Sequence, residues 1–370
     1  MAPVVGTEQL RGPAVFSLRT LAVAACYYGA GRLGLLRHLV VDGAVFSPIW
    51  PPTGVAVAAL LVFGPSCLPG IALGAFFVIL SITTALTPAV LGTLAGSTLA
   101  PLCAYLLLTR FGFRTELSRL KDGLALVFLG ALAAMTVSAT TGVGTLVLTD
   151  RLAAGDFWPV WLAWWVGDAM GVLIVTPVLL LLYNARWHPH PARWRWKEAT
   201  ALVISVAALV PLATYSSVSL LFLVYPLLIW GALRFQLAGT MLCALLASVL
   251  ATLAATDGTG PFAGLSRIEV MAKLQAFNGA MALTALLLSA VITEQRNTRR
   301  SVERACQELV EVLEHLTAGE PPPPRPAEET YDADDADGHG TRTGRADPDA
   351  PFHRADDGPD PGAQRPRQSR

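Results

Sequence analysis

Charged residues are scarce in this sequence. Only 15% of its 370 residues are Asp, Glu, Lys or Arg, whereas 53% are hydrophobic. The mean hydropathy is +0.51, and soluble globular domains usually carry about 25% charged residues. This composition excludes an ordinary soluble domain and indicates an integral membrane protein.

The apolar runs lack the alternation of every second residue that is typical of membrane β-strands. Lipid offers backbone N–H and C=O groups no partners, so we predict an all-α, polytopic bundle of transmembrane helices. Runs of roughly 20 apolar residues predict ten spans, at residues 15–36, 45–63, 68–82, 88–109, 124–149, 158–183, 199–215, 220–233, 237–256 and 274–293. The second, third and eighth are short or broken by proline, so eight full crossings with re-entrant segments are the alternative.

Paired cysteine spacings are also absent. The five cysteines are scattered along the chain, which supports neither a disulfide framework nor a metal site. His188 and His190 lie in the basic, tryptophan-rich stretch "RWHPHPARWRWK", where contact with anionic lipid headgroups explains the whole pattern. We expect the lipid bilayer as a partner, and no metal or other cofactor.

Nucleotide-binding motifs are missing as well. "GVGTLV", which starts at Gly142, lacks the last glycine of the dinucleotide fingerprint. His315 lacks the acidic residue and proline that follow the phosphoacceptor histidine of kinases. No stretch after the last span is apolar enough to fold into a catalytic module. We therefore expect no enzyme activity and no nucleic-acid partner.

Among the segments that border the predicted spans, those at residues 110–122, 186–198 and 296–304 are the most basic, with four Lys or Arg residues each. With ten spans these loops share one side of the membrane, and short cytoplasmic loops retain Lys and Arg. Both termini are then expected in the cytoplasm, at the inner membrane of a bacterium. The first apolar run contains Arg19 and Arg32 and has no clear cleavage site, so we interpret it as an anchor.

The chain is expected to divide into four parts. A cytoplasmic segment (1–14) precedes the transmembrane domain (15–293). Residues 294–316 carry apolar side chains at heptad spacing for under three heptads, which predicts a helix that either promotes a homodimer or lies on the membrane. Residues 317–370 are rich in Pro, Asp, Gly and Arg and cannot bury a core, so we predict a disordered tail.

The stretch "FSPIWPPTGVAVAALLVFG" places three prolines and a tryptophan directly before an apolar run. Trp50 suits an aromatic belt, and Pro51 and Pro52 suit a first helical turn, where the missing N–H has no helical partner. Thr53 is predicted to cap the helix, and Gly54 allows close packing. A helix so short does not span alone, which indicates either broken backbone within the membrane or a half-helix; a simple helix start at the interface is the alternative.

A second stretch, "WPVWLAWWVGDAMGVLIVTPVLLLL", contains an acid within an apolar run. Asp168 lies ten residues after Trp158, about 15 Å deeper and near the centre of the hydrocarbon layer. An acid there is costly and predicts a functional site, although a purely structural link between helices is the alternative. Gly167 and Gly171 share a face and allow a close neighbour, and Pro177 predicts a kink.

Several polar side chains in other spans are candidate hydrogen-bond partners for this acid. They are Asn278, Gln275, Thr136, Ser138, Thr140 and Thr141.

Together the two stretches, with "PGIALGAF" from Pro69 to Phe76, resemble the first type of bacterial membrane-associated sensor domain. The resemblance extends over residues 17–296 and implies an input module of the kind found at the N-terminus of sensor kinases, cyclic-di-GMP enzymes and phosphatases. The positions characteristic of that family are Trp50, Pro51, Pro52, Thr53, Gly54, Pro69, Gly70, Gly74, Trp165, Gly167, Asp168, Gly171 and Pro177.

These observations predict a membrane sensory module that lacks a catalytic domain of its own. A ligand or a proton is expected to act near Trp50, Thr53 and Asp168, and the helix 294–316 is expected to pass the change to a separate kinase, cyclase or phosphatase. The candidate sensing residues are Trp50, Pro51, Pro52, Thr53, Gly54, Trp165, Gly167, Asp168 and Gly171. A small-solute or proton-coupled transporter is the main alternative, and a scaffold for other membrane proteins is a third.

Overall fold

The computed structural model describes residues 7–36, 39–41, 44–83, 87–184, 193–216 and 220–318. The chain divides after Glu308 into two units, and the first contains the helical bundle. The predicted tail falls outside the described residues except for its first two positions, 317 and 318, which end the last helix.

The described residues are predominantly helical, as predicted. The α-helices are α1 Thr7–Leu35, α2 Pro51–Phe63, α3 Leu68–Ile82, α4 Pro88–Arg110, α5 Leu120–Ala125, α6 Ala134–Leu148, α7 Phe157–Met170, α8 Thr176–Asn184, α9 Arg193–Tyr215, α10 Val224–Thr256 and α11 Arg267–Ala318. Two π-helical segments, η2 Leu126–Ala133 and η4 Gly171–Val175, join α5 to α6 and α7 to α8. Short 3₁₀ turns are η1 Pro65–Cys67, η3 Ala154–Asp156, η5 Leu221–Leu223 and η6 Gly260–Phe262.

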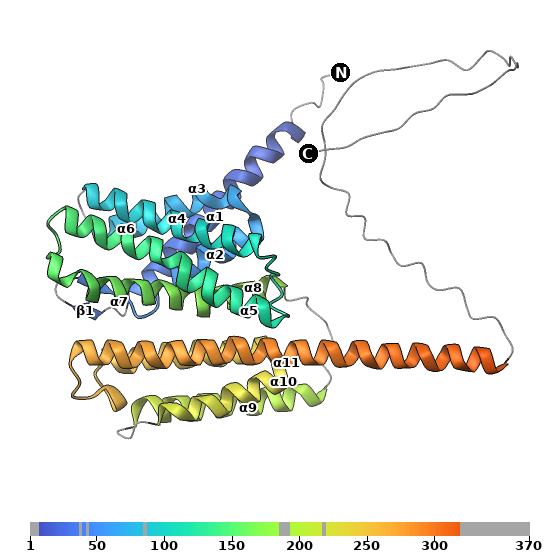
Figure 1. The fold of residues 1–370 in the computed structure, drawn as a ribbon. Helices are drawn as coiled ribbons and strands as arrows, with labels where there is room; N and C mark the ends of the chain where they lie inside the picture. Colours follow the sequence, from blue (N-terminus) through green and yellow to red (C-terminus); the bar gives the residue numbers. More distant parts are fainter. Residues whose placement is uncertain are drawn as a thin grey trace, which may run out of the picture. The chain divides into compact units, whose positions relative to one another are not determined.

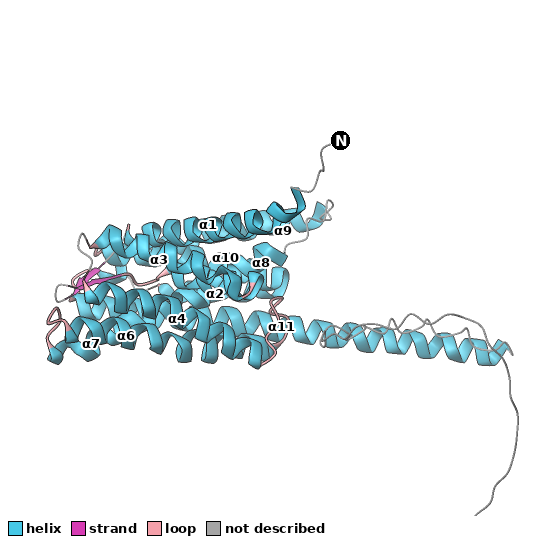
Figure 2. Cartoon of the chain, turned by 90° about the horizontal axis from the view of Figure 1, so that it is seen from above, coloured by secondary structure: helices cyan, strands magenta, loops and turns pink. Residues whose placement is uncertain are grey.

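A short antiparallel hairpin was not predicted. Its strands are β1 Leu39–Val41 and β2 Ala44–Phe46, with Leu39 opposite Phe46. The expected second span at 45–63 is therefore helical only from Pro51, because Val45 belongs to a strand. The hairpin lies at the end of the bundle where α7 begins (Figure 2).

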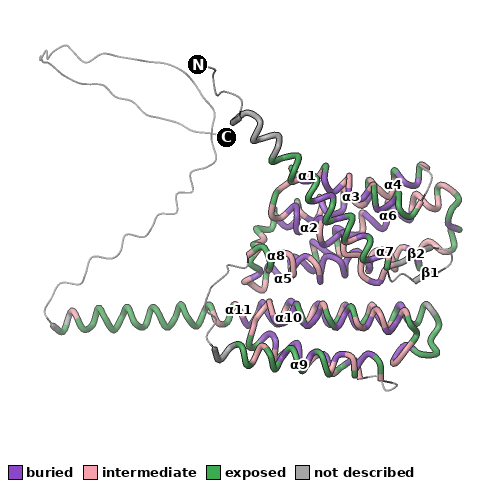
Figure 3. The backbone as a smooth tube through the Cα atoms, turned by 180° about the vertical axis from the view of Figure 1, so that it is seen from behind, coloured by how far each residue is buried: buried purple, intermediate pink, exposed green. Residues whose placement is uncertain are grey.

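Seven helical stretches among the described residues are long and apolar enough to cross a membrane, and α2 is apolar but shorter. The seven are Pro65–Ile82, Pro88–Arg110, Leu120–Leu148, Ala154–Asn184, Trp196–Tyr215, Leu221–Thr256 and Ile268–His315. Many large apolar residues of the helices are exposed, among them Leu18, Leu91 and Val203. Figure 3 shows exposed residues, in green, along helices of the bundle. Such a surface suits lipid and not water.

Helix α10 contains a break at Gln236, whose φ of 53° and ψ of −138° are not helical. A Cβ built on Gly239 would lie 3.1 Å from the carbonyl oxygen of Gly231. Residues eight apart in one straight helix are about 12 Å apart along its axis. The two halves of α10 therefore fold back on each other, as the separate runs 220–233 and 237–256 predicted.

The helices of the first unit form two groups. Figure 1 shows α9, α10 and α11 side by side, with α1–α8 forming the remainder of the bundle. Within the larger group, α1 packs along α2 and α3, and α4 packs along α6. Buried side chains from α4, α6, α9, α10 and α11 belong to one continuous core, and a second core joins α1, α2 and α3.

Residues in or next to the three basic loops lie together at one end of the bundle. The side chain of Asn184 donates to the carbonyl of Thr115 at 3.0 Å, and Glu294 accepts from the backbone N–H of Leu120 at 2.9 Å. Arg296 donates to the carbonyl of Leu233, and Arg234 is paired with Glu198. The break in α10 thus lies at the same end as the basic loops.

Candidate ligand site

Helix α2 begins at Pro51, with Trp50 at the N-cap position and both prolines in the first turn. This corrects the expectation that Thr53 caps the helix, because Thr53 already lies inside the first turn. Its hydroxyl instead donates back to the carbonyl of Trp50 at 2.7 Å. The prolines fit here because the N–H groups they lack would have had no helical partner.

The chain just before α2 is not helical, yet its polar backbone groups have partners. The N–H of Trp50 donates to the carbonyl of Gly167 in α7 at 3.0 Å. The carbonyl of Pro48 accepts from the side chain of Gln275 in α11 at 3.1 Å. Irregular backbone is tolerated within a membrane protein when other parts of the protein satisfy it. Residues 48–50 are thus held between α7 and α11.

Three glycines permit this close approach, as predicted for each of them. A Cβ on Gly167 would lie 2.7 Å from the carbonyl oxygen of Ser47, and one on Gly171 would lie 2.0 Å from that of Trp50. A Cβ on Gly54 would lie 2.3 Å from the carbonyl oxygen of Gly171. Each distance is too short for a real carbon–oxygen contact, so only glycine fits at these positions.

Asp168 is buried in α7, with 2% of its surface exposed. Its Oδ1 lies 3.3 Å from the Thr53 hydroxyl. A hydroxyl has one proton to donate. For the Thr53 hydroxyl the Trp50 carbonyl, at 2.7 Å, is a closer acceptor than Oδ1 of Asp168. The second oxygen, Oδ2, has no hydrogen-bond partner among the described residues.

Most of the polar groups proposed as partners for this acid are engaged elsewhere. Ser138 and Trp164 interact with the carboxyl group, and the Trp164 indole N–H also donates to the Ser138 hydroxyl at 3.3 Å. The amide oxygen of Asn278 accepts from Ser248 at 2.9 Å, while its amide nitrogen has no partner among the described residues. Gln275 donates to Pro48. The hydroxyl of Thr136 donates to the carbonyl of Ala133, and that of Thr141 donates to the carbonyl of Val137. The hydroxyl of Thr140 accepts from the indole N–H of Trp161.

Helix α7 changes to a π-helix at Gly171, three residues after the acid. The irregularity predicted from Pro177 therefore takes the form of a π segment ahead of the proline, which lies in α8. The hydroxyl of Thr176 donates to the carbonyl of Gly54 at 3.1 Å. Single π turns inside helices are often found at functional sites.

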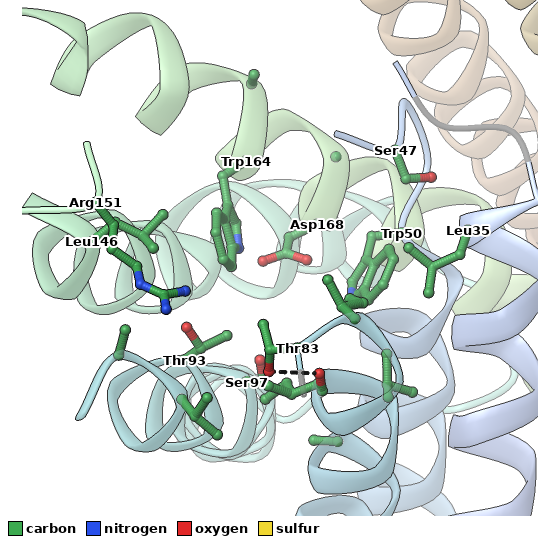
Figure 4. A pocket seen from close by; sticks show the side chains of 18 of the residues that line it. Leu35, Ser47, Trp50, Thr83, Thr93, Ser97, Leu146, Arg151, Trp164 and Asp168 are labelled. Carbon is green, nitrogen blue, oxygen red and sulfur yellow. Dashed lines mark hydrogen bonds between the residues drawn. The ribbon is translucent and has the colours of Figure 1, made fainter. Parts of the chain in front are cut away.

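Asp168 lines a cavity of about 400 Å³. Figure 4 shows its carboxyl group between Trp164 and Trp50, with Thr93, Ser97 and Arg151 also facing the space. Residues from α1, α3, α4, α6 and α7 and from the loops beside them form the walls. The volume falls within the range of small-molecule sites.

The MASE1 family model matches residues 19–296. The chain belongs to the MASE1 family. Members of this family are membrane sensory input modules and not catalytic domains, and the apolar helices make this MASE1 protein a multi-pass membrane protein. Comparison with curated proteins and with solved structures gives no match.

The structure brings most of the predicted sensing residues of this MASE1 protein together. Trp50, Gly167 and Asp168 line the cavity, while Pro51, Pro52, Thr53, Gly54 and Gly171 form the contact between α2 and α7–η4 beside it. Trp165 is the exception, because its indole donates to the carbonyl of Leu132 at 2.8 Å and its ring stacks on Trp161. It does not line the cavity.

Most of the cavity's lining residues were missed by sequence reasoning, and the polar or aromatic ones among them include Tyr27, Arg151 and Trp164. Tyr27 is 1% exposed, and its hydroxyl lies near Ser97 and Trp50. It lies in the first span, far from both motifs in sequence. Only Trp164 carried a signal, because it adjoins the motif of α7.

Proposed function

We propose that this MASE1 protein is a signal-input module of a bacterial inner membrane that responds at the Asp168 cavity and passes the response through α11 to a separate signalling protein. The observation that carries the proposal is the hydrogen bond from Gln275 of α11 to Pro48. It connects the helix proposed for output to the non-helical segment that bears Trp50, a wall of the cavity. A change at the cavity thereby reaches α11 directly.

The proposed topology has ten crossings and cytoplasmic termini. Counting the folded-back α10 as two crossings, and adding α1 and α2 to the seven long apolar stretches, gives this number. Helix α1 has 29 residues, which is long enough to cross. The hydrogen bonds that gather the three basic loops at one end support a common cytoplasmic side.

Cysteine labelling from one side of the membrane tests this topology. In a background without the other cysteines, Cys306 and a Gly155→Cys substitution should react from opposite sides, because five proposed crossings separate them. Both positions are exposed, and a Cβ at Gly155 meets nothing within 4 Å. If α10 crossed only once, the two positions would react from the same side, and the proposed topology would be wrong.

Further contacts along α11 support its role in the relay. Asn278 is buried and accepts a hydrogen bond from Ser248 of α10. A Cβ on Gly279 would lie 3.9 Å from the methyl of Met170, two residues after Asp168. Near the cytoplasmic end, Glu294 accepts from the N–H of Leu120. The same helix continues without a break to Ala318, so a shift or rotation at Gln275 is carried beyond the bundle.

Beyond Glu294, α11 carries exposed apolar side chains at heptad spacing. Val302, Leu309 and Val312 are exposed by 57%, 64% and 41%. Exposed apolar rows of this kind are recognised by partner helices. We propose that a kinase, cyclase or phosphatase docks on them, with a second copy of this chain as the alternative occupant.

A photo-reactive amino acid at position 309, introduced in the native host, tests the relay. It should capture one kinase, cyclase or phosphatase from intact membranes. The same probe at Leu91, an exposed apolar position on α4, should not capture it. Capture of only a second copy of this chain, or equal capture at both positions, would contradict relay to a separate partner.

The transporter alternative makes a different prediction. Purified protein in liposomes would then move a solute or protons, and Asp168→Asn would stop this movement. The fold-back in α10 and the short α2 resemble the broken helices of transporters. Solute and proton flux should therefore be measured in addition to partner capture.

A further inference from the structure

Two polar atoms in the cavity wall lack partners. They are Oδ2 of Asp168 and the hydroxyl oxygen of Thr87, both buried and without a hydrogen bond among the described residues. A buried polar atom left unpaired costs about 1–3 kcal/mol, and such atoms in native proteins require an explanation. A ligand that donates hydrogen bonds to them from inside the cavity supplies one.

The surroundings of Oδ2 suit a positively charged group. A carboxylate only accepts hydrogen bonds, and it draws cations in a site shielded from water. Figure 4 places the indoles of Trp50 and Trp164 on either side of Asp168. These indole rings give the surroundings of the acid an apolar character. An acid between two tryptophans therefore favours an organic ammonium over an inorganic cation or an anion.

The cavity also contains a positive charge. Arg151 is an exposed residue of the loop after α6, and its guanidinium faces the cavity (Figure 4). Guanidinium groups pair with carboxylates through two parallel hydrogen bonds. The rest of the wall is largely apolar, with side chains that include Val78, Ile79, Val90 and Leu152. The cavity thus offers one acid, one base and an apolar surface beside them.

We propose that the cavity binds a small zwitterionic amine, such as an amino acid with an apolar side chain, whose ammonium contacts Asp168 and whose carboxylate contacts Arg151. This assignment rests on the proposed sensory function and names its stimulus. Occupancy would hold Trp50 against α7, and Gln275 would transmit that constraint to α11.

Binding to the purified full-length protein in nanodiscs tests the assignment. The probes are leucine and phenylalanine, followed by two analogues of leucine, namely 3-methylbutylamine without the carboxylate and 4-methylpentanoate without the ammonium. Titrations are followed by calorimetry and by the fluorescence of the cavity tryptophans. At least one zwitterion should bind, and leucine should bind at least tenfold more tightly than either of its analogues.

Two substitutions separate the contribution of the ligand's ammonium group from that of its carboxylate. Asp168→Asn should weaken leucine and 3-methylbutylamine alike, by tenfold or more. Arg151→Gln should weaken leucine but not 3-methylbutylamine, so that the two bind equally. Arg110→Gln, a change at the C-terminal end of α4 that does not line the cavity, should alter neither affinity.

The assignment is overturned if no zwitterion binds, if 4-methylpentanoate binds best, or if Arg151→Gln leaves the preference for leucine over the amine intact. Partner capture at position 309 needs no ligand. Failed binding with successful capture would therefore remove the ligand class and leave the sensory function standing, whereas failed capture would remove the function itself.

Discussion

Replacing Gly171 with alanine should destabilise the protein by about 3 kcal/mol, because the new methyl group would overlap backbone that cannot move away. Its Cβ would lie 2.0 Å from the carbonyl oxygen of Trp50. That carbonyl also accepts the Thr53 hydroxyl, and the N–H of the same residue is bonded to Gly167. Relief of the overlap would require α2 to separate from α7. Thermal unfolding of the protein in detergent measures the loss.

Gly144 provides the matched control. It lies inside α6, and a Cβ there would meet nothing within 4 Å. Gly144→Ala should leave stability unchanged or raise it by up to about 1 kcal/mol, since alanine is the better helix former. Equal stability of the two variants would show that the contact between α2 and α7–η4 is looser than the geometry indicates.

The motif residues of this contact could be predicted because their chemistry is local. Proline at a first helical turn and glycine at a close crossing each follow from backbone geometry. The hairpin β1–β2 could not be predicted, since its strands are three residues each and too short for a recognisable pattern. Thr53 was wrongly predicted as the cap, because the helix already starts at Pro51 and Trp50 takes the N-cap position, where its N–H is bonded to α7.

The cavity itself was beyond sequence reasoning. Its walls come from five helices and the loops beside them, and no pattern within one helix reports the space left between several. Tyr27 and Arg151 carry no motif. The acid was found because a carboxyl group in an apolar run is conspicuous. That only its Oδ2 is unpaired depends on contacts between several helices, which the sequence does not report.

The Asp168→Asn substitution should abolish the response of the captured partner while leaving the fold intact. Asparagine keeps the size of the side chain but removes its capacity for negative charge. Oδ2 is unpaired in the described structure, so the substitution breaks no bond at that atom and removes the penalty of a buried acid. Stability should stay unchanged or rise by up to about 2 kcal/mol. Thermal unfolding and partner output in native membranes are the two measurements.

Asp122 is the buried acid to compare with it, at 1% exposure. Its Oδ2 pairs with Arg119 at 3.2 Å, and its Oδ1 accepts from the N–H of Arg114 at 3.3 Å. Asp122→Asn should therefore destabilise the protein by about 1–2 kcal/mol, because Arg119 loses its counter-charge. If Asp168→Asn were the more damaging of the two, Asp168 would be a structural link between helices, since an acid kept for signalling contributes little to the fold that holds it.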